Sequence, residues 1–189
     1  MVSFRGMKHM KKILSALCVS TLLLSGCGLI GNDKDDKKAS EENIGDGYFK
    51  GDTLRTKDAE IKIKGSKLVE NFRQDDKRGP YIVFEYEYTN KSKKNMTAEK
   101  SWDDHFELIK DTKNIEEKIS KSYIYIKDNT KYHDLNENSN VLVKPNDNVT
   151  AIVAYSIKKE PSKLILKGHT TDDEIESKAL GEKVIKVEK

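Results

Sequence analysis

Apolar and polar positions alternate along much of the chain after residue 80, and this alternation predicts β-strands. The clearest case is the segment 80–89, where one face carries four apolar or aromatic side chains: Ile82, Phe84, Tyr86 and Tyr88. A second alternating face follows the turn residues 145–147 and carries five such side chains: Val149, Ala151, Val153, Tyr155 and Ile157. A period of two, rich in β-branched and aromatic residues, is typical of strands with one buried face.

Shorter stretches with the same character are expected to add further strands: 59–69, 105–110, 122–127, 140–143, 163–166 and 183–187. Gly65 indicates a bulge in the first of these. Helical signals are few. A capping-box spacing at 171–174, with Gly181 beyond it, predicts a short helix over 172–180, and a weaker signal covers 114–119. The pattern therefore predicts an all-β fold, an antiparallel β-sandwich of seven to eight strands with at most one or two short helices.

The N-terminal segment, residues 1–26, resembles a bacterial lipoprotein signal peptide. Basic residues and no acids precede an apolar run over 13–24, which is too short to span a bilayer but fits an export signal. Leu24, Ser25 and Gly26 lead directly into Cys27, as in the lipobox of that family. The resemblance implies cleavage before Cys27 and a diacylglyceryl lipid on its thiol. The alternative is an ordinary secretory signal peptide followed by a chance cysteine.

A polar, charge-mixed stretch follows and is expected to be a disordered tether. Residues 27–47 hold runs such as 32–38 and 40–43 with almost no large apolar side chain, so they cannot bury enough surface to fold. An EF-hand calcium loop is the alternative for the acidic run, but its fixed alternation and central glycine are missing. Residues 48–189 are then expected to form the folded domain.

The charge balance depends on the export segment. The chain holds 35 Lys and Arg against 32 Asp and Glu, a formal net charge of +3. Four of those basic residues lie in residues 1–26, which hold no acid, so the remaining chain carries 31 basic and 32 acidic side chains. Nucleic-acid binding through a basic patch is therefore not expected.

The order of motifs in the domain resembles the immunoglobulin-like domains of unknown function at the C-terminus of many Gram-positive lipoproteins. The resemblance rests on four stretches in sequence order: Glu85-Tyr86-Glu87-Tyr88-Thr89-Asn90-Lys91-Ser92, Phe106-Glu107-Leu108, Lys144-Pro145-Asn146-Asp147 before the strand 149–157, and Leu164-Ile165-Leu166. It covers roughly residues 48–168 and implies an immunoglobulin-like sandwich at the outer face of the cell membrane. It brings no catalytic residues with it, and the Cys–Trp–Cys core of antibody domains is missing here.

No catalytic or metal-binding motif stands out. Phosphate loops, nucleophile elbows, His-Glu-x-x-His and Cys-x-x-Cys patterns are absent from the sequence. His105 and Glu107 would share one face of a strand, but two ligands are too few for a metal site, and a solvent-facing edge beside Phe106 is the plainer interpretation. A general-base role for His133 beside Asp134 is weighed against a simple loop, which is favoured. We therefore expect no enzyme activity, no metal and no cofactor apart from the lipid on Cys27.

Aromatic side chains are the best candidates for a binding surface. Exposed Tyr and Trp are common in recognition surfaces because they combine apolar area with a polar group. The candidates are Tyr81, Trp102, Tyr123 and Tyr125, with Phe72, Arg73 and Arg78 as neighbours. The alternative for each tyrosine is a place at the rim of the core.

The leading hypothesis is a lipid-anchored, extracellular, non-catalytic module that binds a protein or an envelope ligand. An immunity or exclusion lipoprotein is one specific form of it. A solute-binding lipoprotein serving a transporter is an alternative, although such proteins are usually two-lobed and about twice as long. An envelope hydrolase is the least favoured alternative.

Overall fold

Antiparallel β-strands make up most of the chain that the structure describes. The structure is a computed structural model and describes residues 45–70, 72, 75, 77–126, 131–157, 163–170 and 177–186. The chain divides into two units, Met1–Ser40 and Glu41–Lys189, and every described residue belongs to the second unit. The signal peptide, Cys27 and most of the tether expected from the sequence lie outside the described residues.

Eleven strands and two helices are found among the described residues. The strands are β1 (Tyr48–Lys50), β2 (Thr53–Arg55), β3 (Ala59–Val69), β4 (Tyr81–Asn90), β5 (Met96–Thr97), β6 (Phe106–Asp111), β7 (Glu116–Ile119), β8 (Leu142–Val143), β9 (Asn148–Ser156), β10 (Leu164–His169) and β11 (Ala179–Ile185). The helices are α1 (Ala98–His105) and α2 (Lys131–Ser139). No described helix has the length and apolar character needed to cross a membrane.

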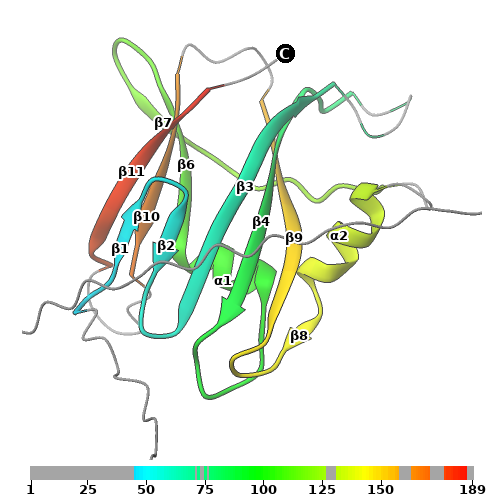
Figure 1. The fold of residues 1–189 in the computed structure, drawn as a ribbon. Helices are drawn as coiled ribbons and strands as arrows, with labels where there is room; N and C mark the ends of the chain where they lie inside the picture. The colour runs from blue at the N-terminus through cyan, green and yellow to red at the C-terminus, as the bar shows by residue number, and fades with distance from the viewer. Residues whose placement is uncertain are drawn as a thin grey trace, which may run out of the picture. The chain divides into compact units, whose positions relative to one another are not determined.

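The strands form two main sheets that face each other as a sandwich (Figure 1). The five-stranded sheet has the order β1-β2-β3-β4-β9, and the four-stranded sheet has the order β11-β10-β6-β7. Every strand pair is antiparallel, and β5 and β8 form a small separate ladder. The expected all-β sandwich is confirmed. Four strands that the sequence did not predict, β1, β2, β5 and β7, raise the count above the expected seven to eight, because strands of two to four residues are too short to show alternation.

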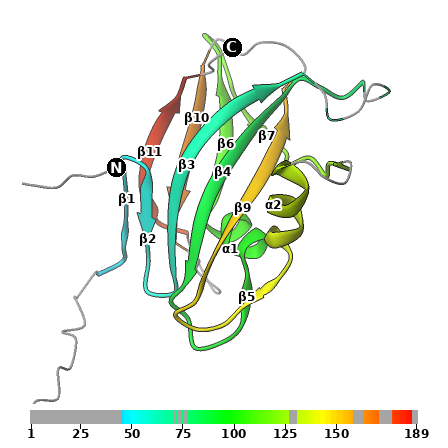
Figure 2. The same cartoon turned by 45° about the vertical axis from the view of Figure 1, so that its right-hand side comes forward.

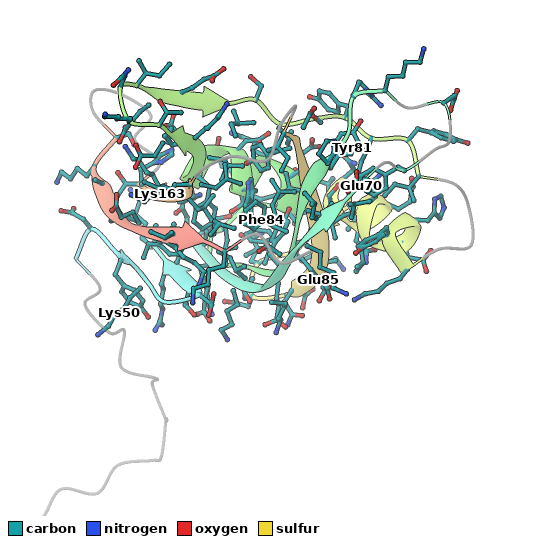
Figure 3. All side chains as sticks on the ribbon, turned by 90° about the horizontal axis from the view of Figure 1, so that it is seen from above. Lys50, Glu70, Tyr81, Phe84, Glu85 and Lys163 are labelled. Carbon is teal, nitrogen blue, oxygen red and sulfur yellow. The ribbon has the colours of Figure 1, made fainter. Side chains whose placement is uncertain are left out.

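The main core lies between the two sheets. The apolar face expected on the segment 80–89 points into it, with Ile82, Phe84, Tyr86 and Tyr88 all fully or almost fully buried. Figure 3 shows Phe84 amid the side chains that fill the middle of the domain, whereas Lys50 and Lys163 lie at its periphery. The strand β3 pairs with β4 through a register shift between Ile63 and Gly65, which confirms the expected bulge.

Helix α1 is inserted into this core and contacts strands of both sheets, namely β9 on one side and β6 and β10 on the other. Its indole, Trp102, is 0% exposed. The ring centroids of Trp102 lie 4.6 Å from those of Tyr86 and 4.5 Å from those of Phe106, and its Nε1 donates a hydrogen bond of 2.7 Å to the Tyr155 hydroxyl. The expectation that Trp102 belongs to a binding surface is therefore wrong. A helical period turns Trp102 inward and leaves its neighbour Asp103 exposed.

Helix α2 lies beside β9 (Figure 2), where a second, smaller apolar cluster covers part of the outer face of β4 and β9. Here Ile126 of the segment 122–126 packs with four buried residues of the two strands, and α2 adds partly buried side chains. The four strand residues are Tyr81, Val83, Ile152 and Ala154. Tyr81 is 0% exposed, so its expected place on a binding surface is also wrong. Its ring packs at a tilt against Phe72 with centroids 5.2 Å apart, and the first four residues of β4 are buried on both faces.

The helices do not lie where the sequence signals placed them. Residues 116–119 of the weaker signal form β7, and the end of the predicted helix 172–180 belongs to β11, while 171–176 lie outside the described residues. Helix α1 instead begins at Thr97, whose hydroxyl accepts a hydrogen bond of 3.1 Å from the Lys100 amide. Three of its eight residues are acidic and one is lysine, so the helical spacing of its few buried residues is not recognisable in the sequence.

Phe49 on β1 fixes how the edge of the five-stranded sheet meets β10 and β11. Its ring packs edge-on against Phe106 at 5.2 Å between centroids. Two glycines make room for it: a Cβ on Gly168 would meet the Phe49 side chain, and one on Gly181 would meet the Phe49 carbonyl oxygen inside van der Waals contact. Gly181 also has a φ of +148°, which other residues rarely adopt.

This packing predicts a large effect for one glycine substitution and a small one for another. Gly181→Ala should lower the free energy of unfolding by about 1–3 kcal/mol, because both the backbone conformation and the contact with Phe49 are strained. Gly65→Ala is the matched control, since a Cβ there meets nothing within 4 Å, and it should change stability by less than about 1 kcal/mol. Urea denaturation followed by Trp102 fluorescence measures both. Equal losses for the two variants would contradict this account of the sheet edge.

Candidate functional site

Two of the four aromatic candidates, Tyr123 and Tyr125, are exposed. They lie on the segment 121–126, which runs from β7 toward α2, and their side chains are 78% and 65% exposed. The residues between and after them, Ile124 and Ile126, pack into the cluster beneath α2. The segment thus keeps its apolar side toward the protein and presents its tyrosines to solvent. It contains a single bridge to β9 rather than the strand expected over 122–127.

Lys121 fixes the start of this segment to helix α1. Its Nζ donates hydrogen bonds of 2.6 Å to Glu99 and 2.6 Å to Asp103, and its side chain is only 16% exposed. Burial opposes the positive charge, but the hydrogen bonds to Asp103 and Glu99 outweigh it and raise the pKa of the Lys121 ammonium. Nζ also lies 5.5 Å from the centroid of the Tyr123 ring.

Backbone contacts hold the same segment on β9. The Ser122 amide donates 2.8 Å to the Ala154 carbonyl, and the Ser122 hydroxyl accepts 3.0 Å from the Ser156 amide. On the other side, Arg78 donates 3.0 Å to the Tyr123 carbonyl. The exposed tyrosines therefore sit on a backbone that is fixed from both sides.

A polar pocket of about 120 Å³ opens beside Tyr123, between α1, the C-terminal end of α2 and strand β9. Eight of its lining residues have polar side chains: Tyr86, Glu99, Lys121, Ser122, Tyr123, Asn136, Ser139 and Asn140. They come from strand β4, both helices or their ends, and the segment 121–126, so only the fold brings them together. We call this cavity the Tyr86 pocket.

The Tyr86 hydroxyl is the unusual group in this pocket. Its side chain is 0% exposed, and no described residue makes a hydrogen bond to its Oη. Burial first, and then the negative charges of Asp103 and Glu99, raise the pKa of the phenol well above its ordinary value, so the hydroxyl keeps its proton. An uncharged donor without an acceptor is thus held at the pocket wall.

The histidines do not form a catalytic or metal site with the partners that the sequence suggested. His105 ends α1 instead of lying on a strand with Glu107, is 2% exposed, and donates from Nδ1 to the Ser101 carbonyl at 2.8 Å. Its Nε2 lies 3.3 Å from the Thr56 hydroxyl and 3.7 Å from Asp58. The solvent-facing edge expected at His105 is therefore wrong. No group of three or more metal-ligand side chains occurs among the residues that the structure describes.

His133 also differs from its expected setting. It lies within helix α2 rather than in a loop, and successive residues of a helix point in directions about 100° apart. Asp134, which is exposed, is therefore not aligned behind the imidazole as a general-base pair requires.

The observed fold is an all-β sandwich, and the comparisons with known proteins assign it to a family. Residues 33–170 match the family described as Domain of unknown function (DUF5067), and the chain belongs to this family. No match was found among curated proteins.

Two solved structures resemble the chain. The first, described as a candidate lipoprotein from Staphylococcus aureus subsp. aureus NCTC 8325, is 26% identical, with a TM-score of 0.58 over 71% of this chain and 90% of that one. The second, an NMR structure of a protein from Enterococcus faecalis, is 13% identical, with a TM-score of 0.52 over 71% of this chain and 92% of that one. The second likeness concerns the fold alone.

Several pocket residues were not expected from the sequence. The alternation of tyrosine and isoleucine over 123–126 was a usable signal for the exposed tyrosines. Nothing comparable connects Lys121 with Glu99, which lies 22 positions earlier on a helix that the sequence did not predict. Tyr86 was correctly placed on the core face of its strand, but its missing partner is visible only in three dimensions.

The two buried tyrosines that approach Trp102 should respond oppositely to loss of their hydroxyl. Tyr86→Phe removes an unpartnered buried hydroxyl and should raise the free energy of unfolding by about 1 kcal/mol or more. Tyr155→Phe removes the acceptor of the Trp102 indole and should lower it by about 1–3 kcal/mol. Chemical denaturation of both variants measures the difference. A loss of stability in Tyr86→Phe as large as that in Tyr155→Phe would contradict the description of Tyr86.

The contact between Asp58 and His105 should appear in the acid stability of the protein. His105 and, to a lesser extent, the Thr56 hydroxyl at 2.7 Å lower the pKa of Asp58 to about 2, against an ordinary value of 3.8. The unfolded chain therefore takes up this proton first, so the stabilisation is complete above about pH 5 and is lost as the pH falls toward 2. Asp58→Asn should be less stable than the wild type at pH 5, and the gap should close toward pH 2.

Urea denaturation between pH 2 and pH 6 measures this gap. Asp52→Asn serves as the control, because Asp52 makes an exposed ion pair with Lys183 and its loss should matter little at any pH. A gap between wild type and Asp58→Asn that is unchanged at pH 2 would contradict the assignment.

Proposed function

We propose that the chain is a membrane-anchored extracellular lipoprotein whose β-sandwich is a non-catalytic binding module for a protein or envelope ligand. The observation that carries the proposal is the pair of exposed tyrosines, Tyr123 and Tyr125, on a fixed segment beside the Tyr86 pocket. Rigid exposed aromatics lose little conformational entropy on binding, and this favours recognition over a passive surface.

The proposed anchor is a diacylglyceryl lipid on Cys27, after cleavage behind Leu24-Ser25-Gly26. The similarity to a candidate lipoprotein from a Gram-positive bacterium supports it. Two acyl chains suffice for stable membrane attachment, whereas one would be marginal. The domain would then face outward within a short tether's length of the membrane.

The proposal of a non-catalytic role is supported by the structural contacts that the titratable side chains make. His105 is buried in hydrogen bonds that join the end of α1 to the loop before β3. The Lys121 ammonium donates hydrogen bonds to Glu99 and Asp103, and these bonds hold the segment 121–126 on helix α1. An immunity or exclusion lipoprotein remains one specific form of the proposal, because such a task requires binding and display rather than chemistry.

The anchor is tested by Cys27→Ala. The variant should lose the membrane-bound fraction of the protein, because no lipid can be attached, while Cys18→Ala should leave that fraction unchanged, since Cys18 would be removed with the signal peptide. Fractionation of cells into membrane and medium, with mass spectrometry of the N-terminal peptide, measures both. An unmodified Cys27 in membrane-bound wild-type protein would contradict the anchor.

The binding surface is tested by photocrosslinking on living cells. A photoreactive benzoylphenylalanine in place of Tyr123 or Tyr125 should yield covalent adducts with an envelope component. Tyr48 is the matched control, since it is also exposed, at 41%, but lies on β1. Adducts of equal yield at all three positions, or none at 123 and 125, would contradict a binding role for this segment.

A further inference from the structure

The Tyr86 hydroxyl points to the chemistry of the ligand. A buried hydroxyl without a partner is unfavourable, and native proteins rarely keep one. Tyr155, whose ring packs into the same core, uses its hydroxyl to accept from Trp102. A phenylalanine would fill the core at position 86 equally well, so the phenol has a use outside the core. Its donor needs an acceptor, and Tyr86 is one of the residues that line the pocket, so a ligand there is the candidate acceptor.

The other groups of the Tyr86 pocket require both donors and acceptors from a ligand. Lys121 has three N–H groups, and two of them are given to Glu99 and Asp103. The Glu99 carboxylate still has lone pairs that accept further hydrogen bonds, and the Asn136 amide offers one acceptor and two donors. The pocket therefore suits a group that accepts and donates within a short distance.

Charge disfavours the two simplest ionic ligands. Glu99 and Lys121, the charged side chains that line the pocket, balance each other, and Asp103 next to Lys121 adds a negative charge outside the lining, so a carboxylate or phosphate has no positive charge left to pair with. An ammonium would suit the excess negative charge but offers no acceptor to the Tyr86 hydroxyl. An uncharged amide meets both demands, because its carbonyl accepts from the phenol and its N–H donates to a carboxylate.

The rim of the pocket favours a sugar over a peptide as the carrier of that amide. Protein interfaces usually have an apolar centre and a polar rim. Here most of the lining residues are polar, and one of them, Tyr123, presents a largely exposed ring, with Lys121 Nζ 5.5 Å from its centroid. Sugar rings present flat C–H faces that stack on such a ring, and a cavity of about 120 Å³ has room for one small side group rather than a chain segment.

We propose that the Tyr86 pocket binds an acetamido sugar of an envelope glycan. The acetamido carbonyl accepts a hydrogen bond from the Tyr86 hydroxyl, the acetamido N–H donates to Glu99, and the sugar ring stacks on Tyr123. The inference rests on the proposed function, since the domain meets envelope glycan only if it is displayed outside the membrane.

The test is a titration of the protein, purified in detergent, with three neutral probes. They are the N-acetylglucosamine tetramer, the glucose tetramer (which lacks acetamido groups) and tetraglycine amide (which has amides but no sugar). Trp102 fluorescence and NMR shifts of the Asn136 side-chain amide report on binding, because both groups adjoin Tyr86 or its pocket. We expect the acetamido sugar to bind with a dissociation constant of the order of 1 mM and the other two at least about tenfold more weakly.

Affinity measurements on three variants test whether the N-acetylglucosamine tetramer binds in the Tyr86 pocket. Tyr86→Phe, which keeps the ring, should weaken binding of the N-acetylglucosamine tetramer by about tenfold, as the loss of one buried hydrogen bond does. Tyr123→Ala should weaken it as well, and Tyr48→Phe, on the distant strand β1, should leave it unchanged.

Several outcomes would overturn the inference. They are equal binding of the glucose tetramer, preference for the peptide, unchanged affinity in Tyr86→Phe, and no binding of any probe. If one of these occurs while photocrosslinking at Tyr123 still gives an adduct, the binding module stands and only the glycan assignment fails. If crosslinking fails as well, both are wrong.

Discussion

The insertion of helix α1 between the two sheets is the constraint on which the rest of this structure depends. Trp102 is wholly buried there, in contact with aromatic rings of β4 and β6 and hydrogen-bonded to Tyr155 of β9. A helix that turns its indole inward leaves one flank toward solvent, and that flank carries Glu99 and Asp103, which are four residues apart and therefore neighbours on the helix surface. These two carboxylates hold Lys121, and Lys121 begins the segment that presents Tyr123. Core packing and the candidate binding surface are thus one connected arrangement.

A second feature is that β4 over residues 81–84 and β9 over residues 151–155 are buried on both faces. The sheet core lies on one side, and the cluster around Tyr81, under α2, lies on the other. Strands in this position have little freedom to move, so a polar group on them keeps a fixed direction. Tyr86 is such a group. Its hydroxyl reaches the pocket from a strand that the surrounding packing holds in place, and this is the preorganisation that a small binding site needs.

The fold was largely predictable from the sequence, whereas the site was not. Period-two alternation identified β4 and β9 with their correct inner faces, and Pro145-Asn146 marked the turn before β9, where Asn146 adopts a φ of +67°. Trp102 was misplaced because its helix has only eight residues and half of them are acidic or lysine. Tyr81 was misplaced because an alternating strand usually has one exposed face, and nothing in the sequence shows that α2 covers it.

The pocket could not be predicted from the sequence, and the reason differs from that for Trp102 and Tyr81. Its polar groups come from positions between 86 and 140, and their proximity depends on tertiary packing alone. The family description adds no activity to carry over, since it is a domain of unknown function. The site therefore had to be inferred from burial, charge and an unmet hydrogen bond.

The most direct measurement of the central claim is a crystal structure of the protein grown with the N-acetylglucosamine tetramer. The account predicts an acetamido carbonyl oxygen within about 3 Å of the Tyr86 Oη, with a sugar ring against Tyr123. A Tyr86 hydroxyl bonded instead to another atom of the protein, with the sugar elsewhere or not bound, would contradict it.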